Sequence, residues 1–175
     1  MVTNKKTFSF LSLIRRTGAS LFFLGYFPFA SGTLGSTVAI AGVWCTYSKW
    51  PSFYSPQNIL YYWGAMFLLA GISIFLSSKS KEIFGKEDSS RIIIDEVAGQ
   101  FITFFMIPIS WKTLAAGFFL FRFFDIVKPF PINEMQELEG GVGVTMDDVL
   151  AGLFANVSLL LILASYSMIK SYLNM

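Results

Sequence analysis

The chain has 175 residues, of which 54% are hydrophobic and 14% are charged, and its mean hydropathy is +0.61. A soluble domain usually carries about 25% charged residues, so this composition indicates a membrane protein, with an unusually apolar soluble domain as the alternative. The net charge of +2 argues against a nucleic-acid-binding surface, and the absence of histidine excludes histidine nucleophiles, general bases and metal ligands. The single cysteine, Cys45, lies in an apolar run and excludes an intrachain disulfide.

The N-terminal stretch Phe8–Phe29 is apolar but is interrupted by Arg15-Arg16. We therefore interpret residues 1–30 as a segment whose amphipathic helix lies in the membrane interface rather than crossing the bilayer. This stretch lacks a small-residue cleavage site after a clean apolar core, which argues against a cleaved signal peptide.

Five apolar runs follow, at Thr33–Tyr47, Ile59–Leu76, Ile92–Ile109, Leu114–Val127 and Val149–Ile169. A helix needs about 20 apolar residues to cross a bilayer. The second and fifth runs reach this length, whereas the other three are short unless flanking residues join them. The pattern predicts an all-α, polytopic membrane protein in which residues 1–175 form one domain. We expect five transmembrane helices, or four if the third and fourth runs form a shallow re-entrant pair.

The distribution of basic residues orients this topology. With the N-terminus in the cytoplasm, ten of the 13 lysine and arginine residues lie inside, and only Lys49, Lys112 and Lys170 lie outside. The same topology places all 11 acidic residues on the cytoplasmic side. The short polar motifs that flank the apolar runs would then meet at one membrane face. Carboxylates that are kept at such positions usually serve chemistry or transport.

The third run carries Asp95-Glu96 near its start, and Gly99 follows four residues after Asp95. Acidic residues at a helix N-terminus are favoured by about 0.3–1 kcal/mol each, so simple capping is the alternative interpretation. Neighbouring residues on a helix point about 100° apart, so one carboxylate can cap the helix while the other faces elsewhere. Gly99 lies on the face of Asp95, one turn deeper, where it leaves room for a helix or a ligand.

The fourth run ends with Arg122, Asp125, Lys128 and Pro129. Arg122 and Asp125 are three residues apart and share a helix face, so an intrahelical ion pair is the alternative interpretation. Pro129 is expected to end the helix. Asp125 could instead bind a metal ion while Arg122 and Lys128 hold phosphate oxygens.

Two glycine-containing segments open apolar runs. The segment Gly140–Gly143 precedes Asp147-Asp148, and its glycines could let the backbone approach a ligand and expose N–H groups to an anion, although an N-cap is a sufficient role for one aspartate. A Gly/Ser/Thr turn that enters a helix is also an anion site. In the segment 31–36 the candidate phosphate ligands are Ser31, Thr33, Gly35 and Ser36.

Taken together, the motifs would bring five carboxylates under one membrane surface: Asp95, Glu96, Asp125, Asp147 and Asp148. Oxygen ligands without histidine or cysteine select a hard cation, with Mg²⁺ preferred. Carboxylates this close would repel one another without a cation between them.

Four motifs in this order resemble bacterial phosphatidylglycerophosphatase A over about residues 27–156: FASGTLGS, IIIDEVAGQFITFFMIP, FRFFDIVKPFPI and GGVGVTMDDVLAG. The resemblance implies a Mg²⁺-dependent phosphatase of the bacterial inner membrane that converts phosphatidylglycerophosphate to phosphatidylglycerol and phosphate. The family's acidic positions then fall on the five carboxylates named above, and its basic positions fall on Arg122 and Lys128.

We hypothesise that the carboxylates hold one or two Mg²⁺ ions that polarise the phosphoryl group and activate a water for attack on phosphorus. Arg122 and Lys128 would stabilise charge on the equatorial oxygens. An aspartate nucleophile is an alternative that the sequence leaves open, as it does the proton donor and the oligomeric state. Rival classes are an ion-coupled transporter, a CDP-alcohol phosphotransferase and a structural membrane subunit. The position of the acidic residues at one membrane edge and the lack of an internal repeat weigh against a transporter. The lack of the CDP-alcohol signature weighs against the phosphotransferase.

Overall fold

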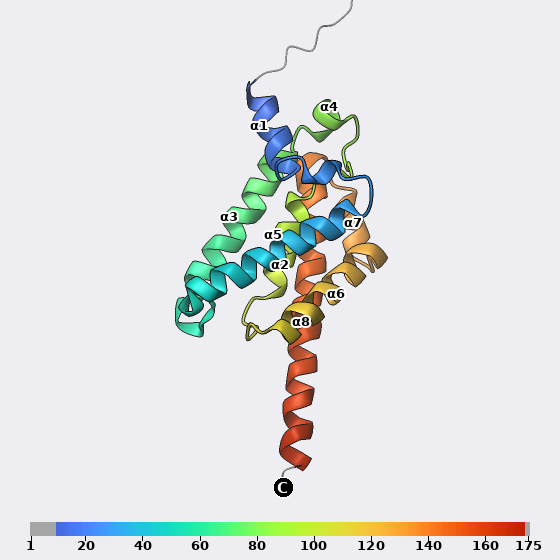
Figure 1. Cartoon of the computed structure of the whole chain (residues 1–175). Coiled ribbons are helices and arrows are strands. Elements are labelled where there is room, and N and C mark those ends of the chain that lie inside the picture. Colours follow the sequence, from blue (N-terminus) through green and yellow to red (C-terminus); the bar gives the residue numbers. More distant parts are fainter. Residues whose placement is uncertain (1–9, 174–175) are drawn as a thin grey trace, which may run out of the picture.

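The computed structural model describes residues 10–173, which form helices and connecting turns without any strand (Figure 1). The all-α prediction is therefore confirmed for this part of the chain. The helices, in chain order, are α1 (Phe10–Ala19), η1 (Leu24–Tyr26), α2 (Ser31–Lys49), η2 (Pro51–Tyr54), η3 (Pro56–Asn58), α3 (Ile59–Ser77), α4 (Ser80–Phe84), α5 (Ile94–Thr103), α6 (Trp111–Val127), α7 (Ile132–Gln136) and α8 (Gly140–Leu173).

The N-terminal stretch forms a shorter helix than its apolar length suggests. The first nine residues, including Phe8, Lys5 and Lys6, lie outside the described residues. From Phe10 the chain forms α1, which ends at Ala19 because Leu21, Phe22 and Phe23 have left-handed φ values of 45°, 54° and 70°. Such φ values are costly for residues with a Cβ and cannot continue a right-handed helix. The exposed side chains of Phe10, Leu13 and Ile14 give α1 an apolar surface.

Two helices are long and apolar enough to cross a membrane. These are Pro56–Ser77, which contains α3, and the helix α8 over Gly140–Leu173. They correspond to the second and fifth apolar runs, the two that the sequence marks as long enough. The helices α2 and α6 have 19 and 17 residues, so flanking residues do extend the first and fourth runs.

The third apolar run is not a continuous helix. Helix α5 has only ten residues and ends at Thr103, and residues 104–110 form a turn in which Met106 has a φ of 59°. A buried helix end must satisfy its free carbonyl groups. Asn156 of α8 does so here, because its Nδ2 donates to the backbone oxygens of Thr103 (2.9 Å) and Phe105 (2.7 Å).

Helix α8 begins at Gly140, nine residues before the predicted start of the fifth run. The last helix is therefore longer than the fifth apolar run, and the segment Gly140–Gly143 forms its first turn. A Cβ at Gly141 would collide with the backbone oxygen of Ile74, and one at Gly143 would collide with that of Leu138. These glycines therefore allow close packing of backbones, which accounts for them without an anion.

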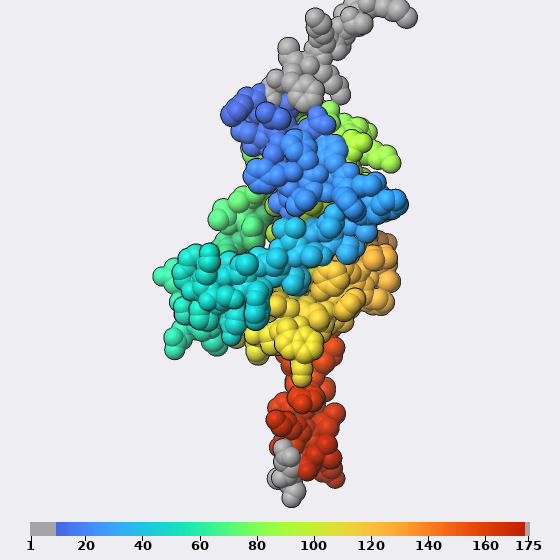
Figure 2. Space-filling model, viewed as in Figure 1, coloured from blue at the N-terminus to red at the C-terminus, as the bar shows by residue number. Residues whose placement is uncertain are grey.

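The ends of the helices that carry the polar motifs lie toward one end of the molecule, with α1 and α4 beyond them (Figure 1). The turns at 50–58 and 104–110 lie toward the opposite end. The C-terminal half of α8 projects from the bundle on that side (Figure 2), and its apolar side chains, such as Leu161 and Ile169, are exposed.

Candidate active site

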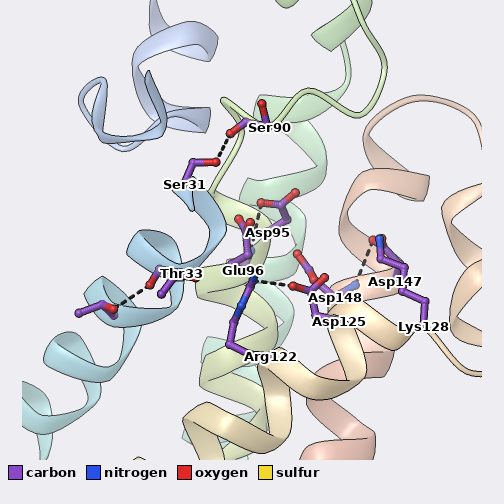
Figure 3. A network of polar contacts seen from close by, with 11 residues as sticks. Ser31, Thr33, Ser90, Asp95, Glu96, Arg122, Asp125, Lys128, Asp147 and Asp148 are labelled. Carbon is purple, nitrogen blue, oxygen red and sulfur yellow. Dashed lines mark hydrogen bonds and ion pairs between the residues drawn. The ribbon is translucent and has the colours of Figure 1, made fainter. Parts of the chain in front are cut away.

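Three of the predicted carboxylates converge where α5 packs against α8. Asp95, Glu96 and Asp148 each offer an oxygen atom, and these atoms lie within 4.8 Å of one another (Figure 3). Asp95 and Asp148 are buried and Glu96 is half-buried. We refer to these three residues as the carboxylate trio.

Two glycines let α5 and α8 approach closely enough to form the trio. A Cβ at Gly99 would collide with the backbone oxygen of Asp148 and would lie 2.6 Å from the ring of Phe121. A Cβ at Gly152 would collide with the backbone oxygen of Gly99. The spacing of Gly99 after Asp95 leaves room for a helix or a ligand at this face, and in the structure α8 lies there.

The first turn of α2 reaches the opposite side of Glu96. A Cβ at Gly32 would lie 2.5 Å from Glu96 Oε1 and 2.9 Å from Arg122 Nη1. Glu96, the Arg122 guanidinium and the backbone of α2 therefore meet at this glycine. The N-cap residue of α2 is Ala30, and no side chain caps the helix. The first amide groups of a helix lack partners within it, so this turn has the polarity that suits an anion.

Asp125 and Asp147 lie outside the trio, and each forms an ion pair with a basic residue. Arg122 Nη1 donates to Asp125 Oδ2 at 2.5 Å, the i, i+3 pair that the spacing allows as an alternative. Lys128 Nζ donates to Asp147 Oδ2 at 2.6 Å (Figure 3). The side chains of all four residues are at most 22% exposed.

Burial and neighbouring charge alter the protonation of these groups. Burial raises the pKa of Asp95 from 3.8 to about 6, and the charges of Asp147 and Asp88 act in the same direction. Burial and the charges of Asp95 and Asp125 raise the pKa of Glu96 well above its usual range. Burial alone would lower the pKa of Lys128, but its hydrogen bond and ion pair with Asp147 outweigh this and raise it. Lys128 therefore stays charged at neutral pH.

The predicted phosphate ligands of α2 are in different environments. Ser31 Oγ donates to the backbone oxygen of Ser90 at 2.6 Å, and the backbone oxygen of Thr33 accepts from Thr37 Oγ1 at 2.7 Å (Figure 3). A Cβ at Gly35 would lie 3.0 Å from Ile93 and 3.3 Å from the Cβ of Glu96, so Gly35 allows α2 to pack against α5. Ser36 is fully buried.

Two residues that share the surroundings or the helix face of Glu96 are absent from the predicted site. Gly32 lies between Glu96 and Arg122, and Gln100 follows Glu96 by four residues and is fully buried. The signal for Gln100 was present, because the spacing from Glu96 to Gln100 equals the spacing from Asp95 to Gly99.

The trio can hold a metal ion. Glu96 Oε2 and Asp148 Oδ1 are buried, and neither atom has a hydrogen-bond partner among the described residues. Buried carboxylate oxygens without partners are costly, and a cation that accepts their lone pairs would remove that cost. A donor set made of oxygen alone fits a hard divalent cation.

Comparison with known proteins places this site in a family. A protein of Bacteroides thetaiotaomicron with the provisional name phosphatidylinositol-3-phosphatase is 39% identical over 84% of this chain and 90% of its own length. Phosphatidylglycerophosphatase A of Escherichia coli is 31% identical over 75% of this chain and 73% of its own length. Phosphatidylglycerophosphatase A of Haemophilus influenzae is 45% identical over 48% of this chain and 53% of its own length.

No solved structure matches the chain. The sequence pattern of the phosphatidylglycerophosphatase A family, however, matches residues 17–163, which include the carboxylate trio, both ion pairs and the first turn of α2. The chain belongs to the phosphatidylglycerophosphatase A family of phosphatases.

Proposed function

We propose that the protein hydrolyses the terminal phosphomonoester of phosphatidylglycerophosphate and releases phosphatidylglycerol and phosphate. The observation that carries this proposal is the carboxylate trio beside the Arg122 guanidinium, because it joins a site for a cation to a site for a phosphoryl group. Membership of the family and the names of the E. coli and H. influenzae relatives support the substrate.

The proposed cation is Mg²⁺, held by Asp95, Glu96 and Asp148. When it is bound, it would neutralise phosphoryl charge and activate a water. Asp125 and Asp147 remain candidate ligands of a second ion, but each is paired with a basic residue in the structure. Their simplest role is to hold Arg122 and Lys128 in place.

Arg122 and Lys128 are proposed to bind the phosphoryl oxygens. Arg122 presents a planar fork that can form two hydrogen bonds to a phosphate, and Lys128 provides a point charge. The uncapped first turn of α2, with Ser31 and Thr33, would add backbone N–H donors next to Arg122. Gly35 and Ser36 are buried behind this turn, and Gly35 allows α2 to pack against α5.

We propose a single membrane-embedded domain in the bacterial inner membrane, with the N-terminus and the active site at the cytoplasmic face. Helices α3 and α8 would cross the bilayer. Helix α5 is about 15 Å long for its ten residues, too short for a hydrocarbon core of about 30 Å. Its length supports the re-entrant alternative, in which α5 and residues 104–110 dip into the membrane and return through α6.

The test is phosphate release from phosphatidylglycerophosphate by detergent-purified protein in Mg²⁺ and in EDTA. We expect release in Mg²⁺ only. Asp148→Asn should lower the rate about 100-fold or more, the equivalent of about 3 kcal/mol of transition-state stabilisation. The matched control is Glu137→Gln, which removes an exposed carboxylate outside the trio and should keep full activity. Equal activity of the two variants would contradict the assigned site.

The name of the B. thetaiotaomicron relative favours a second lipid substrate, phosphatidylinositol 3-phosphate. Both lipids carry a phosphomonoester on a headgroup at the membrane surface, so the same trio and basic pair could act on either. The two lipids should be compared in one assay at equal surface concentration. A higher kcat/KM for the inositol lipid would reassign the substrate and leave the proposed chemistry unchanged.

A further inference from the structure

A second group of buried polar atoms lies one helical turn deeper than the carboxylate trio. Gln100 follows Glu96 by four residues, which places both side chains on one face of α5 with their Cβ atoms about 5–6 Å apart. Gln100 is fully buried, and neither Nε2 nor Oε1 of its side chain has a hydrogen-bond partner among residues 10–173. A buried primary amide that makes no hydrogen bond is costly and needs an explanation.

Ser36 occupies the corresponding position on α2. It follows Gly32 by four residues, so it lies one turn along α2 from the glycine whose Cβ would contact Glu96. Ser36 is also fully buried, and its Oγ has no partner in the described part of the chain. Both α2 and α5 begin at the end of the molecule that carries the trio and continue away from it (Figure 1).

The unpartnered atoms form a complete set of donors and acceptors. Glu96 Oε2 is an acceptor, Gln100 offers the donor Nε2 and the acceptor Oε1, and Ser36 Oγ–H is a donor. These atoms form no hydrogen bond with one another in the structure. Buried waters that link the serine hydroxyl to the amide oxygen, and the amide nitrogen to the carboxylate, would satisfy all four groups.

We propose that Gln100, supported by Ser36, is a positioning residue that orients the Glu96 carboxylate toward a divalent cation held by the trio. This inference rests on the cation site of the proposed function. Carboxylates that ligate a metal are themselves held by hydrogen bonds, and loss of such an outer partner typically lowers metal affinity about 10–100-fold. Gln100 is neutral, so it can orient Glu96 without adding charge to the site.

The test is Mn²⁺ binding to the detergent-purified protein, followed by electron paramagnetic resonance of the free ion, a measurement that needs no substrate. Gln100→Met keeps the length and volume of the side chain but removes the amide, and it should raise the Kd for Mn²⁺ about 10–100-fold. Ser36→Ala should raise the Kd in the same direction by a smaller factor. The matched control is Ser77→Ala, because Ser77 in α3 is also a fully buried serine whose hydroxyl has no partner.

A merely structural role gives a different result. If Gln100 only fills space or stabilises the bundle, Gln100→Met would change the thermal midpoint in EDTA and leave the Kd for Mn²⁺ at the value of the unaltered protein. That outcome, or a Kd of Ser36→Ala equal to that of Ser77→Ala, would overturn the inference while the proposed phosphatase stands. If Gln100→Met does not fold, Ser36→Ala decides. Absence of Mn²⁺ binding by the unaltered protein would overturn the cation site and this inference together.

Discussion

The raised pKa of Asp95 links the protonation of the site to the stability of the protein. Its carboxyl is buried beside two other carboxylates, and burial raises its pKa from 3.8 to about 6. Between these values the native state binds a proton that the unfolded chain has released. The free energy of unfolding of the cation-free protein should therefore fall as pH rises through this interval, by at most about 3 kcal/mol for this residue. A divalent cation would remove the penalty because it favours the ionised carboxylate.

The first prediction follows from this sign. In EDTA, the thermal midpoint of the detergent-purified protein should decrease from pH 4.5 to pH 6.5, and Asp95→Asn should weaken that decrease because the amide does not titrate. Glu137→Gln, which alters an exposed carboxylate, should show the decrease of the unaltered protein. Adding Mg²⁺ should raise the midpoint more at pH 6.5 than at pH 4.5. If the thermal midpoints of Asp95→Asn and Glu137→Gln decreased equally with pH, Asp95 would not be the source of the decrease.

At the residue scale, the sequence predicts which residues belong to the site better than it predicts which side chains they contact. The trio Asp95, Glu96 and Asp148 was in the predicted set of carboxylates, and the structure brings these three together. Whether Asp125 would point at a cation or at Arg122 could not be predicted, because the i, i+3 spacing is compatible with both. Adjacent aspartates on α8 likewise face about 100° apart, so Asp147 reaches Lys128 while Asp148 joins the trio.

At the scale of elements, the site depends on the contact between α5 and α8. The second prediction is that Gly99→Ala lowers both stability and activity, because the new Cβ would collide with the backbone of Asp148 and displace a member of the trio. Overpacking of this kind costs about 1–3 kcal/mol or more. Thermal midpoints and rates of phosphate release measure the two effects.

The matched control is Gly71→Ala in α3, where a Cβ would meet no atom within 4 Å. Alanine in the middle of a helix is favoured over glycine by about 0.5–1 kcal/mol, so this variant should be at least as stable as the unaltered protein and equally active. If Gly99→Ala matched Gly71→Ala in both measurements, the close approach of α5 and α8 would not be needed for the site.

Element lengths were predictable where apolarity alone decides them, as in α3, which extends over Ile59–Ser77 against a predicted Ile59–Leu76. They were not predictable where a partner helix decides them. Helix α5 stops at Thr103, where Asn156, 53 residues later in the chain, donates a hydrogen bond to the backbone oxygen of Thr103. Helix α8 starts early because Gly141 and Gly143 pack against the backbones of other segments. Neither contact is visible in a hydropathy pattern.

At the scale of the whole molecule, the direction of α3 predicts where the site lies relative to the membrane. Helix α3 runs from the turns at 50–58, toward one end of the bundle, to α4 and the segment that contains Lys86, on the side of the polar motifs (Figure 1). The basic residues predict that the end with Lys86 is cytoplasmic. The lipid substrate would then meet the trio from the inner leaflet, at the depth of its headgroup.

The third prediction tests this orientation with single cysteines. Cys45→Ala gives a cysteine-free background, since the chain has one cysteine. In that background, Gln57→Cys and Lys86→Cys place thiols at exposed positions on either side of α3. In intact spheroplasts of an expressing bacterium, a membrane-impermeant maleimide should label Gln57→Cys, and it should label Lys86→Cys only after permeabilisation. The background protein is the control and should stay unlabelled throughout.

Each pattern of labelling has a distinct structural meaning. The reverse pattern would turn the molecule over and place the trio at the outer face. Equal labelling of both thiols without permeabilisation would mean that α3 does not cross the membrane, even though its hydropathy and length permit it. The expected pattern would show on which side of the membrane the trio lies, without any measurement of activity. Lys86 and Asp95 lie on the same side because no helix between them is long enough to cross the membrane.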